Sequence, residues 1–369
     1  MVPVLRWSQP SLLRIERDGS PAFLLENLGE SSLFSSFSHF FIIKWMSENL
    51  TRKVRARMRT RKSKKKKIWI TLGVIIGILV IGLGSYVFYL YHSVEETANK
   101  MYNPLEGDSN LEKKAREEKL DNTKPISILL MGVDERKGDV GRSDTLIVMT
   151  LNPNKDKMQM VSIPRDTKTE IIGDGRVTKI NAAYAYGGVK MAKDTVENFT
   201  GVKMDYYIQV NMEALSDLVD AIGGITVQND LDWIDEGYYK KGYHYKKGTL
   251  TLDGPQTLGF VRMRHLDPNG DFGRNDRQRE VITAIIDKAT GISTVAHFDE
   301  ILDALGANVK TNITFDQMMT IQKNYRDVRK SVEQYEVKGQ GTPPGQTYYL
   351  NVPEEEKTKV HDMLSENLQ

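Results

Sequence analysis

The sequence predicts an α/β fold, a layered α-β-α sandwich built on a central mixed sheet and preceded by one N-terminal transmembrane helix. An uncharged segment, 68–91, separates a basic head from 278 residues in which apolar runs of strand length alternate with segments of helical periodicity. Such alternation favours a sheet covered by helices. The chain has no cysteine, which excludes disulfides, thiolate metal sites and a cysteine nucleophile.

The net charge of +2 hides two opposite parts. Residues 1–67 carry 15 basic and 5 acidic side chains, whereas residues 92–369 carry 36 basic and 44 acidic ones. This asymmetry indicates a membrane or nucleic-acid contact made by the basic part alone. Eleven basic residues lie between Arg52 and Lys67, directly before the uncharged segment.

Residues 68–91 are predicted to be a membrane anchor, because about 20 apolar residues suffice to cross the bilayer. The segment exceeds the apolar region of a cleaved signal peptide, and no clear cleavage site follows it. The Lys/Arg flank places residues 1–67 in the cytoplasm and residues 92–369 outside, as in a single-pass cell-membrane protein. A DNA-binding arm is the weaker interpretation of the basic run, because the run abuts the apolar span. We expect contact with the lipid bilayer and no nucleic acid.

Residues 1–57 show no sustained periodicity, and Met46 and Met58 lie shortly before the anchor. We expect the residues before one of these methionines to reflect a mis-set start rather than a domain.

Beyond the anchor we expect a polar linker over 92–123 and one α/β domain over 124–369, with its core at 124–290. Apolar runs with little alternation are typical of strands buried on both faces, and apolar residues three or four apart indicate helices. Strands are predicted at 126–133, 145–151, 158–163, 206–210, 225–227, 332–337 and 348–352. Helices are predicted at 189–199, 212–222, 276–289, 298–305 and 315–325, with a last helix after Pro353.

Charged residues gather at the ends of the first three strands. Asp134 follows the first, Arg142 and Asp144 precede the second, and Arg165 and Asp166 follow the third. Ligands of α/β sheets tend to bind beyond strand ends.

Two later segments add further candidates. The alternation over 261–264 predicts an extended segment that points Arg262 and Arg264 to one side. Arg274 and Gln278 are four residues apart and would share a helical face, although Arg274 can also precede the first turn.

Taken alone, each of these residues could equally be a turn residue, a helix cap or part of a solvent-exposed face. Together they are harder to dismiss, because at least four arginines and two aspartates fall at element ends of a net-acidic domain. Arginine binds phosphate oxygens in a bidentate manner. Mg²⁺ commonly binds one or two carboxylates plus substrate phosphates. The combination predicts a site for a diphosphate and a metal ion.

Six ordered motifs resemble the LytR-CpsA-Psr family: GVD at 132–134, GRSDT at 141–145, IPRD at 163–166, KINAAY at 179–184, VRMR at 261–264 and GRNDRQR at 273–279. The resemblance covers about 124–290 and also includes the topology of the anchor. It is closest to the Bacillus-type branch of teichoic acid transferases. It implies an enzyme of Gram-positive bacteria that acts on the outside of the cell membrane. Such an enzyme transfers an anionic glycopolymer such as wall teichoic acid. The donor would be an undecaprenyl-diphosphate carrier and the acceptor the C6 hydroxyl of N-acetylmuramic acid in peptidoglycan.

The resemblance also assigns roles by motif position. Asp134 and Asp144 would hold Mg²⁺ or Mn²⁺. Phosphate oxygens would be bound by Arg142, Arg165, Arg262, Arg264, Arg274 and Arg277, with Gln278 as a polar contact. The helix phase leaves Arg277 and Arg279 open to other roles, and Asp166 can instead orient Arg165. Family members bury a polyprenyl tail, which apolar residues of 212–225 and 281–286 would line, although ordinary core is the commoner role for any one of them.

The resulting mechanism is direct displacement at phosphorus, with the catalytic work assigned to Asp134, Asp144, Arg142, Arg165, Arg262 and Arg264. Whether Asp134 or Asp144 takes the hydroxyl proton stays open. Two alternatives also stay open: a polyprenyl-diphosphate hydrolase that uses water as acceptor, and a membrane-bound transcriptional attenuator. The polymer, the oligomeric state and the role of residues 291–369 are not determined by the sequence.

Overall fold

The computed structural model describes residues 35–134, 141–289 and 298–369. The chain divides into two compact units, Met1–Gly84 and Ser85–Gln369. Their boundary falls within the first helix, α1 (Ser35–Met101). Of the N-terminal part considered as a mis-set start, residues 1–34 lie outside the described residues.

The apolar part of α1 is the feature of the described chain that fits a membrane span. By length and composition, Lys66–Met101 is long and apolar enough to cross a bilayer, and none of its most apolar window is buried in protein. The predicted span 68–91 lies within this stretch. Exposed apolar surface of this extent indicates a membrane or partner contact.

The segment 92–123 is not the linker that we expected. The last residues of α1 belong to the second unit, where Ala98 and Met101 are buried. A second helix follows, α2 (Asn110–Asp121), which begins with a capping box formed by Ser109 and Glu112 and buries Leu120. Most residues of α2 are charged, so the sequence shows no apolar periodicity there, and the helix start marked by Ser109 and Glu112 was missed.

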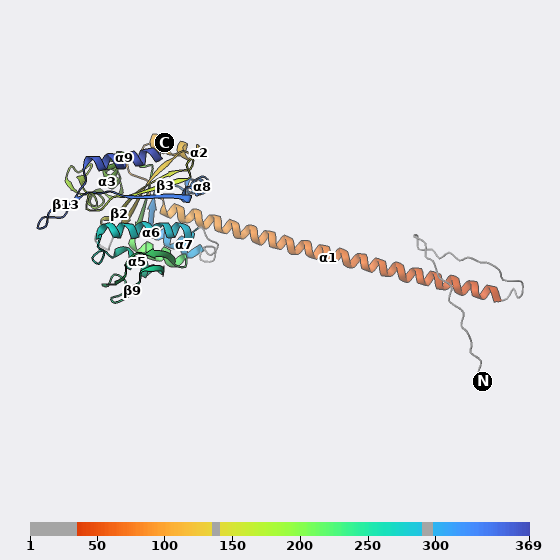
Figure 1. Cartoon of the computed structure of the whole chain (residues 1–369). Helices are drawn as coiled ribbons and strands as arrows, with labels where there is room; N and C mark the ends of the chain where they lie inside the picture. The colour runs from red at the N-terminus through yellow and green to blue at the C-terminus, as the bar shows by residue number, and fades with distance from the viewer. Residues whose placement is uncertain (1–34, 135–140, 290–297) are drawn as a thin grey trace. The chain divides into compact units, whose positions relative to one another are not determined.

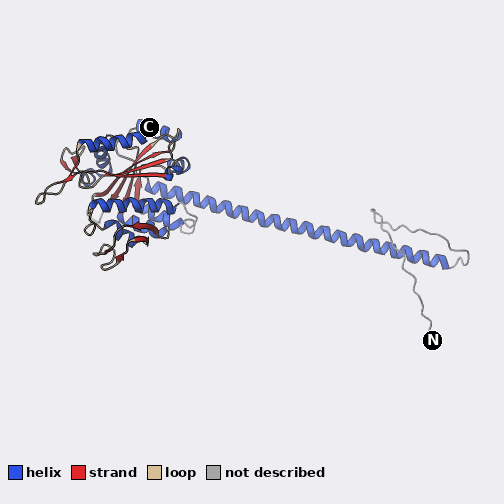
Figure 2. Ribbon diagram, viewed as in Figure 1, coloured by secondary structure: helices blue, strands red, loops and turns tan. Residues whose placement is uncertain are grey.

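A six-stranded mixed sheet forms the centre of the second unit (Figure 2). Its strand order is β11-β6-β1-β2-β3-β12. The pairs β1·β2, β2·β3 and β6·β11 are antiparallel, whereas β1·β6 and β3·β12 are parallel. The strands are β1 (Ile126–Val133), β2 (Ser143–Asn152), β3 (Lys157–Ser162), β6 (Tyr206–Asn211), β11 (Val309–Thr311) and β12 (Ser331–Glu336).

Helices cover both faces of this sheet (Figure 1). Leu129 and Met131 of β1 pack in one core with residues of α3 (Ala182–Thr200) and α9 (Glu354–Asn367). Ile128 of the same strand packs in a core on the opposite face, together with Ile282 of α6 (Asp271–Ala289). Alternate residues of one strand therefore enter different cores, as the period of two requires. The predicted α-β-α sandwich is confirmed.

A third hydrophobic core contains Trp233, Tyr245, Phe260 and Val281 among its buried residues. Further helices are α4 (Met212–Ala221), α5 (Gly254–Arg262), α7 (Phe298–Asn308) and α8 (Phe315–Asn324), and a 3₁₀ helix spans Arg326–Lys330. Two-stranded sheets are formed by β4 (Lys168–Glu170) with β5 (Val177–Lys179), β7 (Ile225–Asn229) with β10 (Gly248–Leu252), β8 (Trp233–Ile234) with β9 (His244–Tyr245), and β13 (Gln340–Gly341) with β14 (Leu350–Asn351).

One element differs in kind from the prediction. The segment around Arg262 was expected to be extended, but α5 is a helix that ends there. It begins with a capping box, in which the Asp253 side chain accepts from the Gln256 N–H and the Gln256 side chain accepts from the Asp253 N–H. Pro255 in the first turn completes a strong helix-start signal. That signal outweighs the short alternation of apolar and basic residues at 261–264.

Candidate functional site

The antiparallel pairing of the first three strands brings their charged ends together. The end of β1 lies against the start of β2, where Val133 pairs with Ser143. The Asp134 N–H donates to the Arg142 carbonyl oxygen at 3.4 Å. The end of β3 lies beside the same strand, because the Ile163 N–H donates to Leu146 O at 2.8 Å. Asp134, Asp144 and Arg165 therefore share one edge of the sheet, as predicted.

Arg165 lies at the centre of a carboxylate network. Its Nη1 is 3.1 Å from Asp144 Oδ1, and its Nε is 3.2 Å from Asp271 Oδ2. Asp166 is more distant, at 3.8 Å, and pairs with Lys179 at 2.6 Å. Burial alone would lower the pKa of Arg165, but Asp144, Asp271 and Asp166 together raise the pKa above its usual value. The guanidinium is thus held firmly, with its charge largely balanced by the protein.

Arg274 has a different environment. It is 5% exposed, and its Nη2 donates to Asp271 Oδ2 at 3.1 Å and more weakly to the Asp144 carbonyl oxygen at 3.4 Å. Among the described residues its buried Nε–H has no hydrogen-bond partner. Burial, partly offset by Asp271, lowers the pKa of Arg274 below its usual value. A buried guanidinium with an unused N–H is suited to bind an anion.

The C-terminus of α5 supplies two further arginines. Arg262 is the last residue of the helix, and its Nη2 is 3.8 Å from Asp134 Oδ1. Met263 has an extended backbone (φ −59°, ψ 134°), which turns the chain before Arg264. Arg264 Nε lies 3.2 Å from His265 Nε2. A helix end, rather than strand alternation, brings Arg262 and Arg264 together.

These side chains line one polar pocket of about 310 Å³. Four arginines and two aspartates are among its described lining residues, so cationic groups outnumber anionic ones. The lining residues are Asp134, Asp144, Arg165, Met212, Tyr238, Val261, Arg262, Arg264, Arg274 and Gln278. The structure therefore brings seven of the nine predicted site residues together around one cavity.

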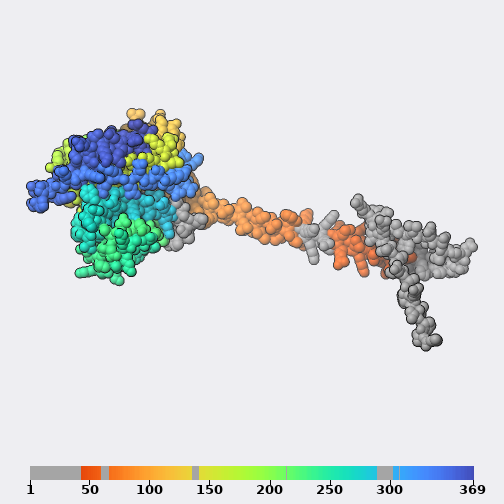
Figure 3. Space-filling view, in the orientation of Figure 1, coloured from red at the N-terminus to blue at the C-terminus, as the bar shows by residue number. Residues whose placement is uncertain are grey.

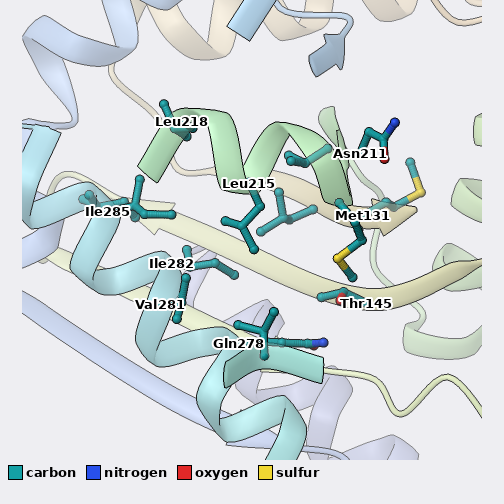
Figure 4. Close-up of a pocket in the computed structure, with 15 residues that line it drawn as sticks. Met131, Thr145, Asn211, Leu215, Leu218, Gln278, Val281, Ile282 and Ile285 are labelled. Carbon is teal, nitrogen blue, oxygen red and sulfur yellow. The ribbon is translucent and has the colours of Figure 1, made fainter. Parts of the chain in front are cut away.

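An apolar cavity of about 180 Å³ adjoins the polar pocket, because Met212, Val261 and Gln278 line both. It lies between the sheet and helices α4 and α6, and Leu215 and Ile282 point into it from opposite sides (Figure 4). In the same view the side chain of Gln278 reaches toward Thr145, away from Leu218 and Ile285. The apolar residues predicted to line a lipid tunnel at 212–225 and 281–286 supply much of this lining.

Two predicted arginines, Arg142 and Arg277, lie elsewhere, as does Arg279, whose role was left open. Arg142 is exposed and is not among the described residues that line the polar pocket. Arg277 is buried, ion-paired to Asp267, and donates to the Phe260 carbonyl oxygen at 3.0 Å. Arg279 donates to Ser162 Oγ at 2.6 Å. The assignment of Arg277 to the diphosphate is therefore wrong for this conformation, because its helical phase turns it toward the core that contains Phe260.

The sequence reasoning missed two residues of the site. Asp271 joins Arg165 and Arg274, and it begins α6 five residues earlier than the predicted helix start. A start at Asp271 would have placed Asp271, Arg274 and Gln278 on one face by their spacing of three and four. Tyr238 also lines the pocket, and no motif indicates it.

Comparisons with known proteins identify the family of this chain. The model of the LytR_cpsA_psr family matches residues 88–366. The chain is 46% identical over 308 residues to the polyisoprenyl-teichoic acid–peptidoglycan teichoic acid transferase TagU of Bacillus licheniformis, covering 84% of this chain and 98% of the relative. It is 45% identical to TagU of Bacillus subtilis over 309 residues, with coverage of 84% and 98%. The crystal structure of B. subtilis TagU superposes with a TM-score of 0.55 at 44% identity, covering 67% of this chain and 97% of that one.

These relatives are enzymes named as transferases, and they match this chain over almost their whole length. The chain is likewise a transferase, and it belongs to the LytR_cpsA_psr family.

Proposed function

We propose that this enzyme transfers an anionic glycopolymer of the teichoic acid type from an undecaprenyl-diphosphate carrier to the C6 hydroxyl of N-acetylmuramic acid in peptidoglycan. The observation that carries this proposal is that two unlike cavities adjoin each other. The polar pocket suits a diphosphate, and the apolar cavity that shares Met212, Val261 and Gln278 suits the adjoining prenyl chain. The names of the TagU relatives, and a solved structure of TagT bound to LI-WTA at 31% identity and TM-score 0.57, support the polymer class.

In this mechanism the acceptor hydroxyl attacks the phosphorus that carries the polymer. A new P–O bond forms, the bond from that phosphorus to the bridging oxygen breaks, and undecaprenyl phosphate leaves. Arg165, Arg262, Arg264 and Arg274 bind the phosphate oxygens and offset the charge that develops on them. The hydroxyl proton passes to one of the two pocket carboxylates.

Asp134 and Asp144 are also the residues that would hold Mg²⁺. Both line the polar pocket, and no group of three His, Cys, Asp or Glu residues in the described parts of the chain forms a complete metal cage. Two carboxylates suit Mg²⁺ when substrate phosphates supply the remaining oxygen ligands. Bound there, the ion would neutralise phosphoryl charge. Titration calorimetry should show strong Mg²⁺ binding only after a prenyl diphosphate has been added, and Asp134→Asn should weaken it.

The experiment that tests the function uses the full chain in detergent with a prenyl-diphosphate-linked glycopolymer. Arg262→Ala and Asp144→Ala should lower transfer by roughly a thousandfold or more, the scale of a phosphate-binding arginine. Arg326→Ala, an exposed arginine of the 3₁₀ helix, is the control and should retain full activity. Wild-type turnover in both site variants would refute the assignment. Comparing a peptidoglycan oligomer with water as acceptor distinguishes a transferase from a diphosphate hydrolase.

The proposed location is the cell membrane, with the N-terminus in the cytoplasm and the catalytic domain outside. The basic flank of the apolar part of α1 supports this orientation. Because the chain has no cysteine, single cysteines report its topology cleanly. A membrane-impermeant maleimide applied to intact cells should label Gln346→Cys and not Ser47→Cys, and the opposite pattern would reverse the orientation.

A further inference from the structure

A hairpin remote from every motif reaches the polar pocket. Strands β8 and β9 are joined by residues 235–243, and Tyr238 of this connection is the one aromatic side chain among the described residues that line the pocket. The green segment that contains it lies at the surface of the domain, next to the teal residues of α6 (Figure 3). The arginines and carboxylates of the pocket are assigned to the diphosphate and the metal ion, so Tyr238 is a lining residue without an assigned ligand group.

The connection is held rigid by a buried carboxylate. Asp235 is 2% exposed and accepts four backbone N–H groups, those of Gly237 (3.2 Å), Tyr238 (3.1 Å), Tyr239 (2.8 Å) and Lys240 (2.7 Å). Charge-assisted hydrogen bonds of this kind are stronger than neutral ones. The backbone of Tyr238 is therefore fixed before any ligand binds.

The same hairpin is packed against the helix that carries Arg262. Tyr245 donates its hydroxyl hydrogen to the Gln256 carbonyl oxygen of α5 at 2.7 Å. A Cβ atom on Gly259 would lie 2.7 Å from Tyr239 Cβ, so the loop and α5 touch where only glycine fits. Tyr238 and the arginines at the end of α5 are consequently placed by one packed unit.

We propose that Tyr238 contacts the sugar attached to the diphosphate, and that Asp235 is the positioning residue for this contact. The inference rests on the proposed function. Phosphate oxygens require the cations of the pocket, and the prenyl chain has the apolar cavity beyond Met212 and Gln278. A sugar ring has apolar C–H faces edged by hydroxyl groups. A tyrosine offers a matching rigid ring with a polar tip, which is how pockets commonly fix the orientation of such ligands.

The test measures binding of two probes to the full chain in detergent: farnesyl diphosphate, and farnesyl diphosphate bearing one N-acetylhexosamine. Tyr238→Ala should weaken the sugar-bearing probe roughly tenfold, the scale of a single aromatic contact, and leave the bare diphosphate unchanged. Tyr238→Phe should retain most of the affinity. Asp235→Ala should reproduce the selective loss through a mobile loop. Tyr186→Ala, an exposed tyrosine that is not among the pocket's lining residues, is the control and should match wild type.

Equal weakening of both probes by Tyr238→Ala, or no change in either, would overturn the proposal. Failure of the underlying function gives a different result, because Arg262→Ala would then leave the affinity for both probes unchanged. If Asp235→Ala does not fold, the comparison of Tyr238→Ala with Tyr238→Phe still decides the question.

Discussion

Replacing Asp271 with asparagine tests whether the two arginines that it bridges are held ready for an anion. Both hydrogen bonds go to one oxygen of Asp271, at 3.2 Å from Arg165 and 3.1 Å from Arg274. An asparagine carbonyl oxygen can occupy that position, so the main loss is the ionic attraction. For a partly exposed carboxylate this is at most about 1 kcal/mol per pair, or about 2 kcal/mol for both.

A bound diphosphate would replace the missing negative charge. The Asp271→Asn variant should therefore be up to about 2 kcal/mol less stable without ligand and should bind farnesyl diphosphate roughly tenfold more tightly than wild type. Urea unfolding can be followed by the fluorescence of buried Trp233 after the other three tryptophans, Trp7, Trp45 and Trp69, have been replaced by phenylalanine. Weaker diphosphate binding by the variant, or equal destabilisation with and without ligand, would contradict the reasoning.

Three further outcomes are expected. Burial raises the pKa of Glu336 to about 7. Because the pKa in the folded state lies above that in the unfolded state, the contribution of Glu336 to stability falls as the pH rises from 4.5 through about 7. Glu336→Gln should abolish this fall when the free energy of unfolding is compared at pH 5 and pH 8. Arg277→Ala should lower the free energy of unfolding by about 3–5 kcal/mol, because it leaves Asp267 buried without its partner; an unchanged midpoint in urea would restore Arg277 as a candidate ligand. Ile282→Trp should fill part of the apolar cavity and weaken a C55 prenyl diphosphate while sparing inorganic diphosphate, both measured by competition binding.

Much of the sheet was predictable because its strands are buried on both faces. The apolar run at 126–133 coincides with β1, since a strand covered by helices on both sides has no polar face to blur its limits. The predicted strand at 158–163 is shifted from β3 by one residue. Strand order and direction were not predictable, because they depend on pairing between residues more than 100 positions apart, as in β12 with β3.

The site was predictable in part, and its errors have a common cause. Asp134, Asp144 and Arg165 follow from the ends of strands, where sequence position fixes location. Arg277 and Asp271 depend instead on the phase and the first residue of α6, which the charged sequence of its first turns does not reveal. The role of Tyr238 depends on a loop placed by Asp235, and only the folded chain brings that loop to the pocket.

Both borders of the central sheet are formed by the last part of the chain. Strand β11 borders β6 and strand β12 borders β3, so a chain that stops before Val309 would leave two strands with unpaired N–H and C=O groups. Such open borders recruit strands from other chains. The 369-residue chain limits this hazard because β11 has three residues and the outermost strand β12 carries the exposed Glu333. Loss of the C-terminal sixth would therefore cause aggregation even with every pocket residue present, and synthesis must reach Glu336 before the domain is protected from self-association.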